Sequence, residues 1–416
     1  MHAIYIGSTL LILASILAFP VFKVSVARTF QLQLVLVCVA DIYASGLALG
    51  FTCVFAAMSG PLVIPKQALL AWGVWAIAMI CAIWNNGYTL RMLFQVVEMF
   101  YYLAIIVLAA SLAERAGGRR RILWGLTLGG LLLALTFLAM PLLYSGSWSA
   151  GLRGRNEGSL VVVFAGIIAP LTLSFWATRR TKLLLFTVSI SSVAATFVAE
   201  SRASSLLGCA ILVAVAFVHV FGLSAMRFAM SGIVLAGLAM QSPVVHERLD
   251  RLFDTERNFS NIERLAMIET CLDLFYEKPL TGWGWGSLEG LLPRRSHTRL
   301  DYPHPHNTYV HFAAELGTLG LIGLSILYGS VGSVALGNYA SNRVHETVFV
   351  ALSGSAIVAL GFVEDYFYGG SRGVIVAVVL GVIFSYGRRS KKAIASHPVT
   401  MKMPRQPLRN QHPATI

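Results

Sequence analysis

The sequence predicts an all-α polytopic membrane protein with about 12 transmembrane helices and one large extramembrane loop. Of its 416 residues, 56% are hydrophobic and only 12% are charged, whereas a soluble domain carries roughly 25% charged residues. The mean hydropathy is +0.72. Long apolar runs recur along the chain, and about 20 such residues cross the ~30 Å hydrocarbon core as a helix. The runs are continuous rather than alternating, which favours helices over a β-barrel.

The candidate spans divide the chain into four parts. Residues 1–241 hold the first nine spans, 242–305 form the loop, 306–387 hold the last three spans, and 388–416 form a basic tail. The first run lacks a basic leading region, so it reads as a retained helix rather than a signal peptide. The expected spans cover approximately residues 3–22, 32–57, 62–84, 90–113, 122–144, 159–178, 182–199, 203–222, 227–241, 307–330, 345–363 and 373–387.

The basic residues indicate the orientation of these spans. They gather in residues 115–121, 179–182 and the tail, which are cytoplasmic if the termini lie inside the cell. The loop 242–305 then lies outside. The net charge of +13 is explained by this topology, so no nucleic-acid partner is expected. The tail is either disordered or lies on anionic membrane lipid of the inner leaflet.

The outer loop has a predicted helix and a glycine-rich segment. Ser260 and Glu263 match a capping box, and the apolar spacing after them predicts an amphipathic helix that ends at Lys278. Arg264 falls in its first turn. The segment 281–287 reads Thr-Gly-Trp-Gly-Trp-Gly-Ser; its glycines permit tight turns beside the membrane surface, and its tryptophans suit an interface or a sugar face.

A polar group enters the tenth expected span. His304, His306 and Asn307 stand at its mouth, where polar residues are costly unless they are paired or functional. An imidazole that titrates near neutral pH suits a general base, so His306 is the candidate for taking a proton from an acceptor hydroxyl. Asn307 can orient that ring or cap the helix. The alternative is an interfacial turn whose histidines bond only to backbone groups.

Arginines on the same face are candidates for binding phosphate. Arg202 and Arg264 could hold a diphosphate through forked hydrogen bonds, and Arg153 and Arg155, in a glycine-rich segment, could assist. The alternative is that they anchor the chain to lipid headgroups or pair with nearby acids.

The last outer turn also carries acids. Glu364 opens a stretch that ends at Arg372, and it could bind sugar hydroxyls or an arginine across the bundle; a solvated turn is the alternative. No Walker loop, Asp-x-Asp, GxSxG or HExxH pattern occurs, and the five Cys show no metal spacing. We therefore expect no metal and no cofactor.

Taken together, these residues resemble the O-antigen ligase and polymerase family of bacterial surface-polysaccharide enzymes. The resemblance lies in Glu200-Ser-Arg202, Arg264, Pro279-Leu-Thr-Gly-Trp-Gly284 and the run from His304 to Leu321. It implies a GT-C-like fold in the bacterial inner membrane, with loop 242–305 and the active site facing the periplasm. It also implies that Arg202, Arg264 and His306 are essential. Residues 155–158 depart from the usual pattern of the family.

The resemblance implies transfer of glycan from an undecaprenyl-diphosphate donor without a metal. The leading hypothesis is a ligase that uses lipid A–core as the acceptor. The close alternative is a polymerase of O-antigen or exopolysaccharide repeat units, in which a growing glycan is the acceptor. A transporter of the lipid-linked sugar is less favoured, because the polar groups lie at one face and no internal repeat is evident. A structural membrane protein is the remaining alternative.

Overall fold

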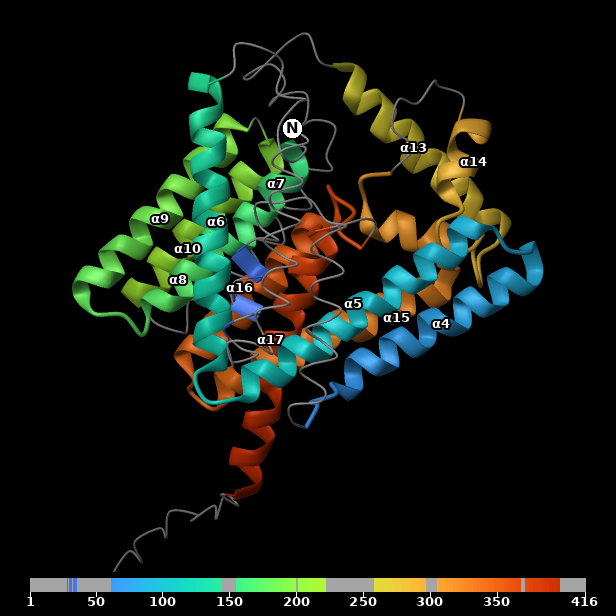
Figure 1. The fold of residues 1–416 in the computed structure, drawn as a ribbon. Coiled ribbons are helices and arrows are strands. Elements are labelled where there is room, and N and C mark those ends of the chain that lie inside the picture. The colour runs from blue at the N-terminus through green and yellow to red at the C-terminus, as the bar shows by residue number, and fades with distance from the viewer. Residues whose placement is uncertain are drawn as a thin grey trace, which may run out of the picture.

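The computed structural model describes residues 61–143, 155–199, 201–221, 258–296, 305–367 and 371–396, together with 28, 30, 31 and 33–35. Every regular element in these parts of the chain is a helix (Figure 1). The helices are α4 (Lys66–Asn86), α5 (Leu90–Glu114), α6 (Gly118–Leu143), α7 (Arg155–Val161), η2 (Val162–Ile168), α8 (Ala169–Ser174), α9 (Arg179–Val198), α10 (Arg202–Phe221), α13 (Asn258–Glu277), α14 (Leu288–Arg295), α15 (Thr308–Ala340), α16 (Val344–Gly361) and α17 (Ser371–Ser396).

The membrane class is confirmed by the length and composition of these helices. Within the described residues, six are long and apolar enough to cross a membrane: α4, α5, α6, α9, α15 and α16. Three shorter apolar helical segments cover residues 158–174, 203–218 and 372–387. The expected spans 3–22 and 227–241, and most of 32–57, lie outside the described residues, so the count of about twelve stays a prediction.

Glycines let the helices between residues 118 and 198 approach one another closely. A Cβ atom at Gly130 of α6 would lie 2.3 Å from the backbone nitrogen of Gly166 in η2. A Cβ at Gly166 would in turn lie 2.5 Å from the Ser192 hydroxyl of α9. Small residues are the usual means of close helix packing in lipid. The expected span 159–178 is shorter than predicted, because the helix ends at Ser174 and Thr178 caps the following helix.

The expected span 307–330 is wrong as a single helix, because α15 breaks at Gly317 (φ 64°). The Tyr309 and Tyr328 rings lie 6.1 Å apart, whereas an unbroken helix would separate them by roughly 28 Å at 1.5 Å per residue. Residues 308–316 therefore fold back along the longer part of the helix. The part after Gly317 is by itself longer than the roughly 20 residues that a span needs.

The break in α15 is closed by the glycine-rich loop before α14. Trp283 N donates to Ala314 O (3.1 Å) and Gly284 N to Glu315 O (2.7 Å), while Thr318 N donates to Pro279 O (2.7 Å). A Cβ at Gly282 would lie 2.3 Å from the Glu315 backbone, so only glycine fits there. Backbone groups freed within a membrane protein need such partners. The loop is thus a structural element of the bundle.

The amphipathic helix of the outer loop is present as α13, with two differences from the prediction. It begins at Asn258, so Ser260 lies inside its first turn and not at the N-cap. Its buried apolar side chains are Met267, Cys271 and Leu274, whereas Leu265 is 53% exposed. Cys271 and Leu274 form a small core with residues of α14 and α15.

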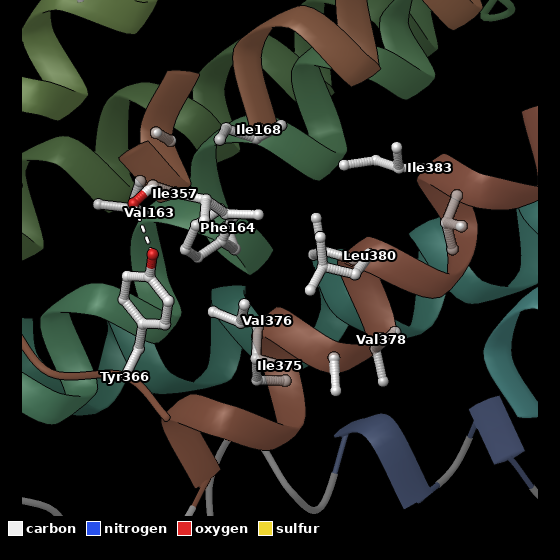
Figure 2. Packing of buried hydrophobic residues seen from close by; sticks show 14 of the residues in the cluster. Val163, Phe164, Ile168, Ile357, Tyr366, Ile375, Val376, Val378, Leu380 and Ile383 are labelled. Atoms are coloured by element: carbon white, nitrogen blue, oxygen red, sulfur yellow. Dashed lines mark hydrogen bonds between the residues drawn. The ribbon is translucent and has the colours of Figure 1, made fainter. Parts of the chain in front are cut away.

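The main core surrounds α17, which packs against α5, α15 and α16. Figure 2 shows its apolar side chains, among them Val376 and Leu380, beside Phe164 of η2 and Ile357 of α16. The helix continues to Ser396, past the expected span end at residue 387, and stops before Pro398. In Figure 1 this end of α17 lies opposite α13 and α14.

Candidate active site

The segment before α15 is tied to the turn after α16. The Asn307 side chain accepts a hydrogen bond from Val310 N (3.1 Å), which caps α15, and donates one to Phe362 O (3.2 Å). The Thr308 hydroxyl donates to Glu364 O (2.8 Å). His306, between them and the loop, has a left-handed backbone (φ 47°). These bonds bring two stretches far apart in the sequence into one site.

His306 and Glu364 face each other in this site. His306 Nδ1 lies 3.6 Å from Glu364 Oε2, an ion-pair distance when the imidazole is protonated. The His306 side chain is 25% exposed and that of Glu364 is 8% exposed. An imidazole held at one nitrogen keeps the other free for a substrate proton. Because its side chain is more exposed than that of Glu364, the His306 imidazole is the more accessible of the two groups.

Arg372, near the beginning of α17, completes the surroundings of Glu364. Its guanidinium donates to Glu364 Oε2 at 3.1 Å. An arginine partner for this acid was one expectation from the sequence, but the particular residue was not identified. The signal was present, because the stretch that Glu364 opens ends at Arg372.

Arg264 of α13 acts on the same carboxylate. Burial alone would raise the pKa of the Glu364 carboxyl, but His306, Arg372 and Arg264 together hold that pKa below its ordinary value. The guanidinium of Arg264 therefore lies within electrostatic range of Glu364.

The other predicted residues are placed only in part. Arg202 is the first residue of α10 and Arg155 the first of α7, but their side chains, and both Arg153 and His304, lie outside the described residues. Helix α7 packs against α10 and α17. The roles predicted for these arginines and for His304 stay predictions.

A buried cluster around His311 was not expected from the sequence. Its Nε2 lies 2.8 Å from Glu315 Oε2, and its Nδ1 contacts Asp365 Oδ2. His311 and Glu315 are each 0% exposed. The signal that could have found them is a pair of ionisable residues, one helical turn apart, within an apolar run.

The Glu315 carboxylate also holds the glycine-rich loop. It accepts hydrogen bonds from Gly286 N (2.7 Å) and Leu288 N (2.8 Å). Trp285 of this loop is buried against His311 and Phe312. The expectation that this tryptophan faces an interface or a sugar is therefore wrong, since the loop folds inward to close the break in α15.

Within the described residues, no group of three or more His, Cys, Asp or Glu side chains is arranged to hold a metal ion. The carboxyl groups of Glu315 and Asp365 reach opposite nitrogens of His311, so they do not converge on one point. The charged groups that do converge are guanidinium, imidazole and carboxylate, a set suited to an anionic substrate.

The fold and this site define a polytopic helical membrane protein with a charged cluster between the segment before α15, the turn after α16 and the beginning of α17. Residues 165–325 match the family model described as O-Antigen ligase. The chain is 22% identical over 277 residues to the O-antigen ligase of Salmonella typhimurium strain LT2. The aligned region covers 61% of this chain and 65% of that protein. Both comparisons point to the O-antigen ligase family as the group of proteins that this chain resembles. It spans just under two thirds of the length of this curated relative.

The matched range has a bearing on the site. It includes Arg202, Arg264 and His306, and it ends before Glu364 and Arg372. The pairing of His306 with Glu364 is therefore seen in the structure and lies outside the range of the family match.

Proposed function

We propose that this protein is a membrane glycosyltransferase that moves a glycan from undecaprenyl diphosphate to a hydroxyl group of lipid A–core. The observation that carries the proposal is the gathering of His306, Glu364, Arg372 and Arg264 at one end of the bundle. The similarity to O-antigen ligases supports a lipid-linked glycan as the substrate. The site faces the periplasm in this proposal, within the bacterial inner membrane.

His306 is the proposed general base. Its Nδ1 faces Glu364, which leaves Nε2 to accept the proton of the acceptor hydroxyl. The hydroxyl oxygen attacks the anomeric carbon of the donor sugar, and the bond between that carbon and the diphosphate oxygen breaks. The electron pair leaves with the lipid diphosphate. A positioned base of this kind contributes roughly 100- to 10,000-fold to the rate.

Guanidinium groups are proposed to stabilise the leaving diphosphate. Arg264 lies close enough to lower the pKa of Glu364, and Arg202 begins a helix of the same bundle. Their fixed positive charges offset the charge that develops on the diphosphate, a task that divalent metals perform in other transferases. Arg372 is paired with Glu364, so we assign it a positioning role. His304, Arg153 and Arg155 are proposed to line the substrate path, whereas the amide oxygen and nitrogen of Asn307 are both bonded to the backbone, so its predicted contact with substrate is replaced by a structural role.

Reconstitution in vesicles tests the proposal. The purified chain is supplied with a glycan on undecaprenyl diphosphate and with either lipid A–core or a second lipid-linked repeat unit as the acceptor. We expect transfer to lipid A–core by the native chain and a loss of roughly 100-fold or more in H306A. The matched control is H345A, because His345 lies in the first turn of α16, at the end remote from Glu364.

The outcomes separate the alternatives. Transfer only to the lipid-linked repeat unit would replace the ligase by a polymerase. Equal activity of H306A and the native chain would remove the proposed base. Movement of the donor across the bilayer without transfer to either acceptor would indicate transport.

A further inference from the structure

The His311 cluster requires an explanation beyond the proposed chemistry. His311 and Glu315 are fully buried and Asp365 is nearly so, so none of these groups can touch a substrate. Placing ionisable groups inside a membrane bundle is costly unless each is paired. The aromatic neighbours Trp285 and Phe312 would accommodate an apolar residue at position 311, but such a residue would leave the Asp365 and Glu315 carboxylates without a partner. The buried imidazole is therefore best explained by the two carboxylates that it contacts, those of Asp365 and Glu315.

The cluster connects three segments around the site: the folded-back part of α15, the turn after α16 and the glycine-rich loop. His311 belongs to the folded-back part of α15 that begins two residues after His306. Its Nδ1 contacts Asp365, the neighbour of Glu364 in the chain. Its Nε2 faces Glu315, which binds the backbone of the loop at Gly286 and Leu288. An imidazole can donate from both nitrogens only when it is protonated.

The turn that carries Glu364 is also held by other contacts, among them the bonds from Asn307 to Phe362 O and from Arg372 to the Glu364 carboxylate. Thr308 binds the Glu364 carbonyl, and the Tyr366 hydroxyl donates to Ile357 O at 3.0 Å, as Figure 2 shows. The backbone is thereby anchored on either side of Asp365. The contact between Asp365 and His311 adds a link from this turn to the folded-back part of α15.

We infer that His311 is a positioning residue, which bridges Asp365 and Glu315 and so holds the Glu364 carboxylate and the glycine-rich loop in place around His306. The inference rests on the proposed function, because it concerns the geometry of the proposed base. Without the bridge, the turn relaxes, Glu364 moves relative to His306, and the imidazole loses its fixed orientation. A displacement of about 1 Å of this kind costs roughly 100-fold in rate.

A double-mutant cycle tests the inference. H311Q, D365N and the combination H311Q/D365N are compared with the native chain in the vesicle assay, with kcat and the KM for each substrate measured separately. We expect each single variant to lower kcat by about 10- to 100-fold with little change in KM. The combined variant should be no slower than the slower single variant, because both remove the same link. The matched control is R295A, which removes an exposed ion pair between Arg295 at the end of α14 and Glu277 at the end of α13.

Two results of the cycle would overturn the inference. One is an unchanged kcat in H311Q. The other is a loss of activity that only follows the loss of folded protein, which would show a purely structural role. Size-exclusion chromatography and the thermal unfolding midpoint of each variant show whether a loss of activity reflects a loss of folded protein.

A second measurement does not depend on glycan transfer and so separates this inference from the proposed function. Diethyl pyrocarbonate modifies accessible histidines, and fragment mass spectrometry locates the product at His306. We expect H311Q to increase the rate of modification of His306 several-fold, as E364Q should, while R295A leaves it unchanged. If E364Q increases this rate and H311Q does not, the positioning role is wrong, whether or not the native chain proves to be a transferase.

Discussion

Glu364 shows how single residues organise the site. It lies just after α16 and is buried, yet its carboxylate meets His306, Arg372 and the charge of Arg264. Burial disfavours an ionised acid, and three cationic or protonatable groups outweigh that effect here. The same carboxylate thus orients the proposed base and offsets the charge of one arginine.

The lowered pKa of Glu364 predicts a pH dependence of stability with a definite sign. Because the folded-state pKa lies below the ordinary glutamate value of about 4.3, the unfolded chain takes up the proton first as the pH falls. The stabilisation is therefore present above the ordinary value and is lost as the pH falls through the folded pKa. We expect the difference in thermal unfolding midpoint between the native chain and E364Q to shrink between about pH 5 and about pH 3.

Thermal unfolding in detergent at several pH values measures this difference. R295A serves as the control, since its ion pair is exposed and exposed pairs contribute little. A difference that grows on acidification would contradict the electrostatic description of Glu364.

At the scale of the element, the broken helix α15 brings His306 to Glu364. The break depends on Gly317, whose positive φ disfavours other residues, and a Cβ there would lie 2.4 Å from the Leu280 backbone. Without the break, residues 308–316 would continue the axis of the long part and carry His306 away from α16.

Two glycine substitutions in α15 test this role. G317A should lower the thermal unfolding midpoint and the glycan transfer activity, because it forces the helix and the loop apart. G329A lies in the same helix with open space around it, and it should be neutral or stabilising because alanine is the better helix former by about 1 kcal/mol. Equal midpoints for the two variants would show that the break is not required.

The sequence predicted some of these elements well and others poorly, for physical reasons. Apolar runs and an Asn before a helix are local signals, so the expected spans near α4, α5, α6 and α16 and the cap at Asn307 agree with the structure. The break at Gly317 could not be predicted, because many glycines occur inside unbroken membrane helices. The partners of His311 come from other elements, and their pairing depends on tertiary packing.

At the scale of the whole molecule, the candidate site lies at one end of the helical bundle. Helices α13 and α14 cover that end, and the far end of α17 is opposite (Figure 1). The distribution of basic residues predicts that α13 and α14 are periplasmic and that the C-terminus is cytoplasmic. The proposed substrates require this orientation, because a glycan joined to lipid A–core must be reached from the periplasm.

Reporter fusions test the orientation. Alkaline phosphatase fused after Ser296 should be active, and the same enzyme fused after Ile416 should be inactive, because it matures only in the periplasm. Green fluorescent protein at the same two positions should give the opposite pattern. Phosphatase activity at the C-terminal fusion alone would invert the topology and exclude a periplasmic site.

The central claim is that arginines from separate stretches surround a lipid diphosphate beside His306. The most direct test is an electron cryo-microscopy structure of the chain with undecaprenyl diphosphate bound in a lipid nanodisc. We predict that the diphosphate lies between the guanidinium groups of Arg202 and Arg264, with His306 Nε2 facing the oxygen that would carry the sugar. A diphosphate bound elsewhere on the bundle, or an Arg202 side chain that points away from His306, would contradict the claim.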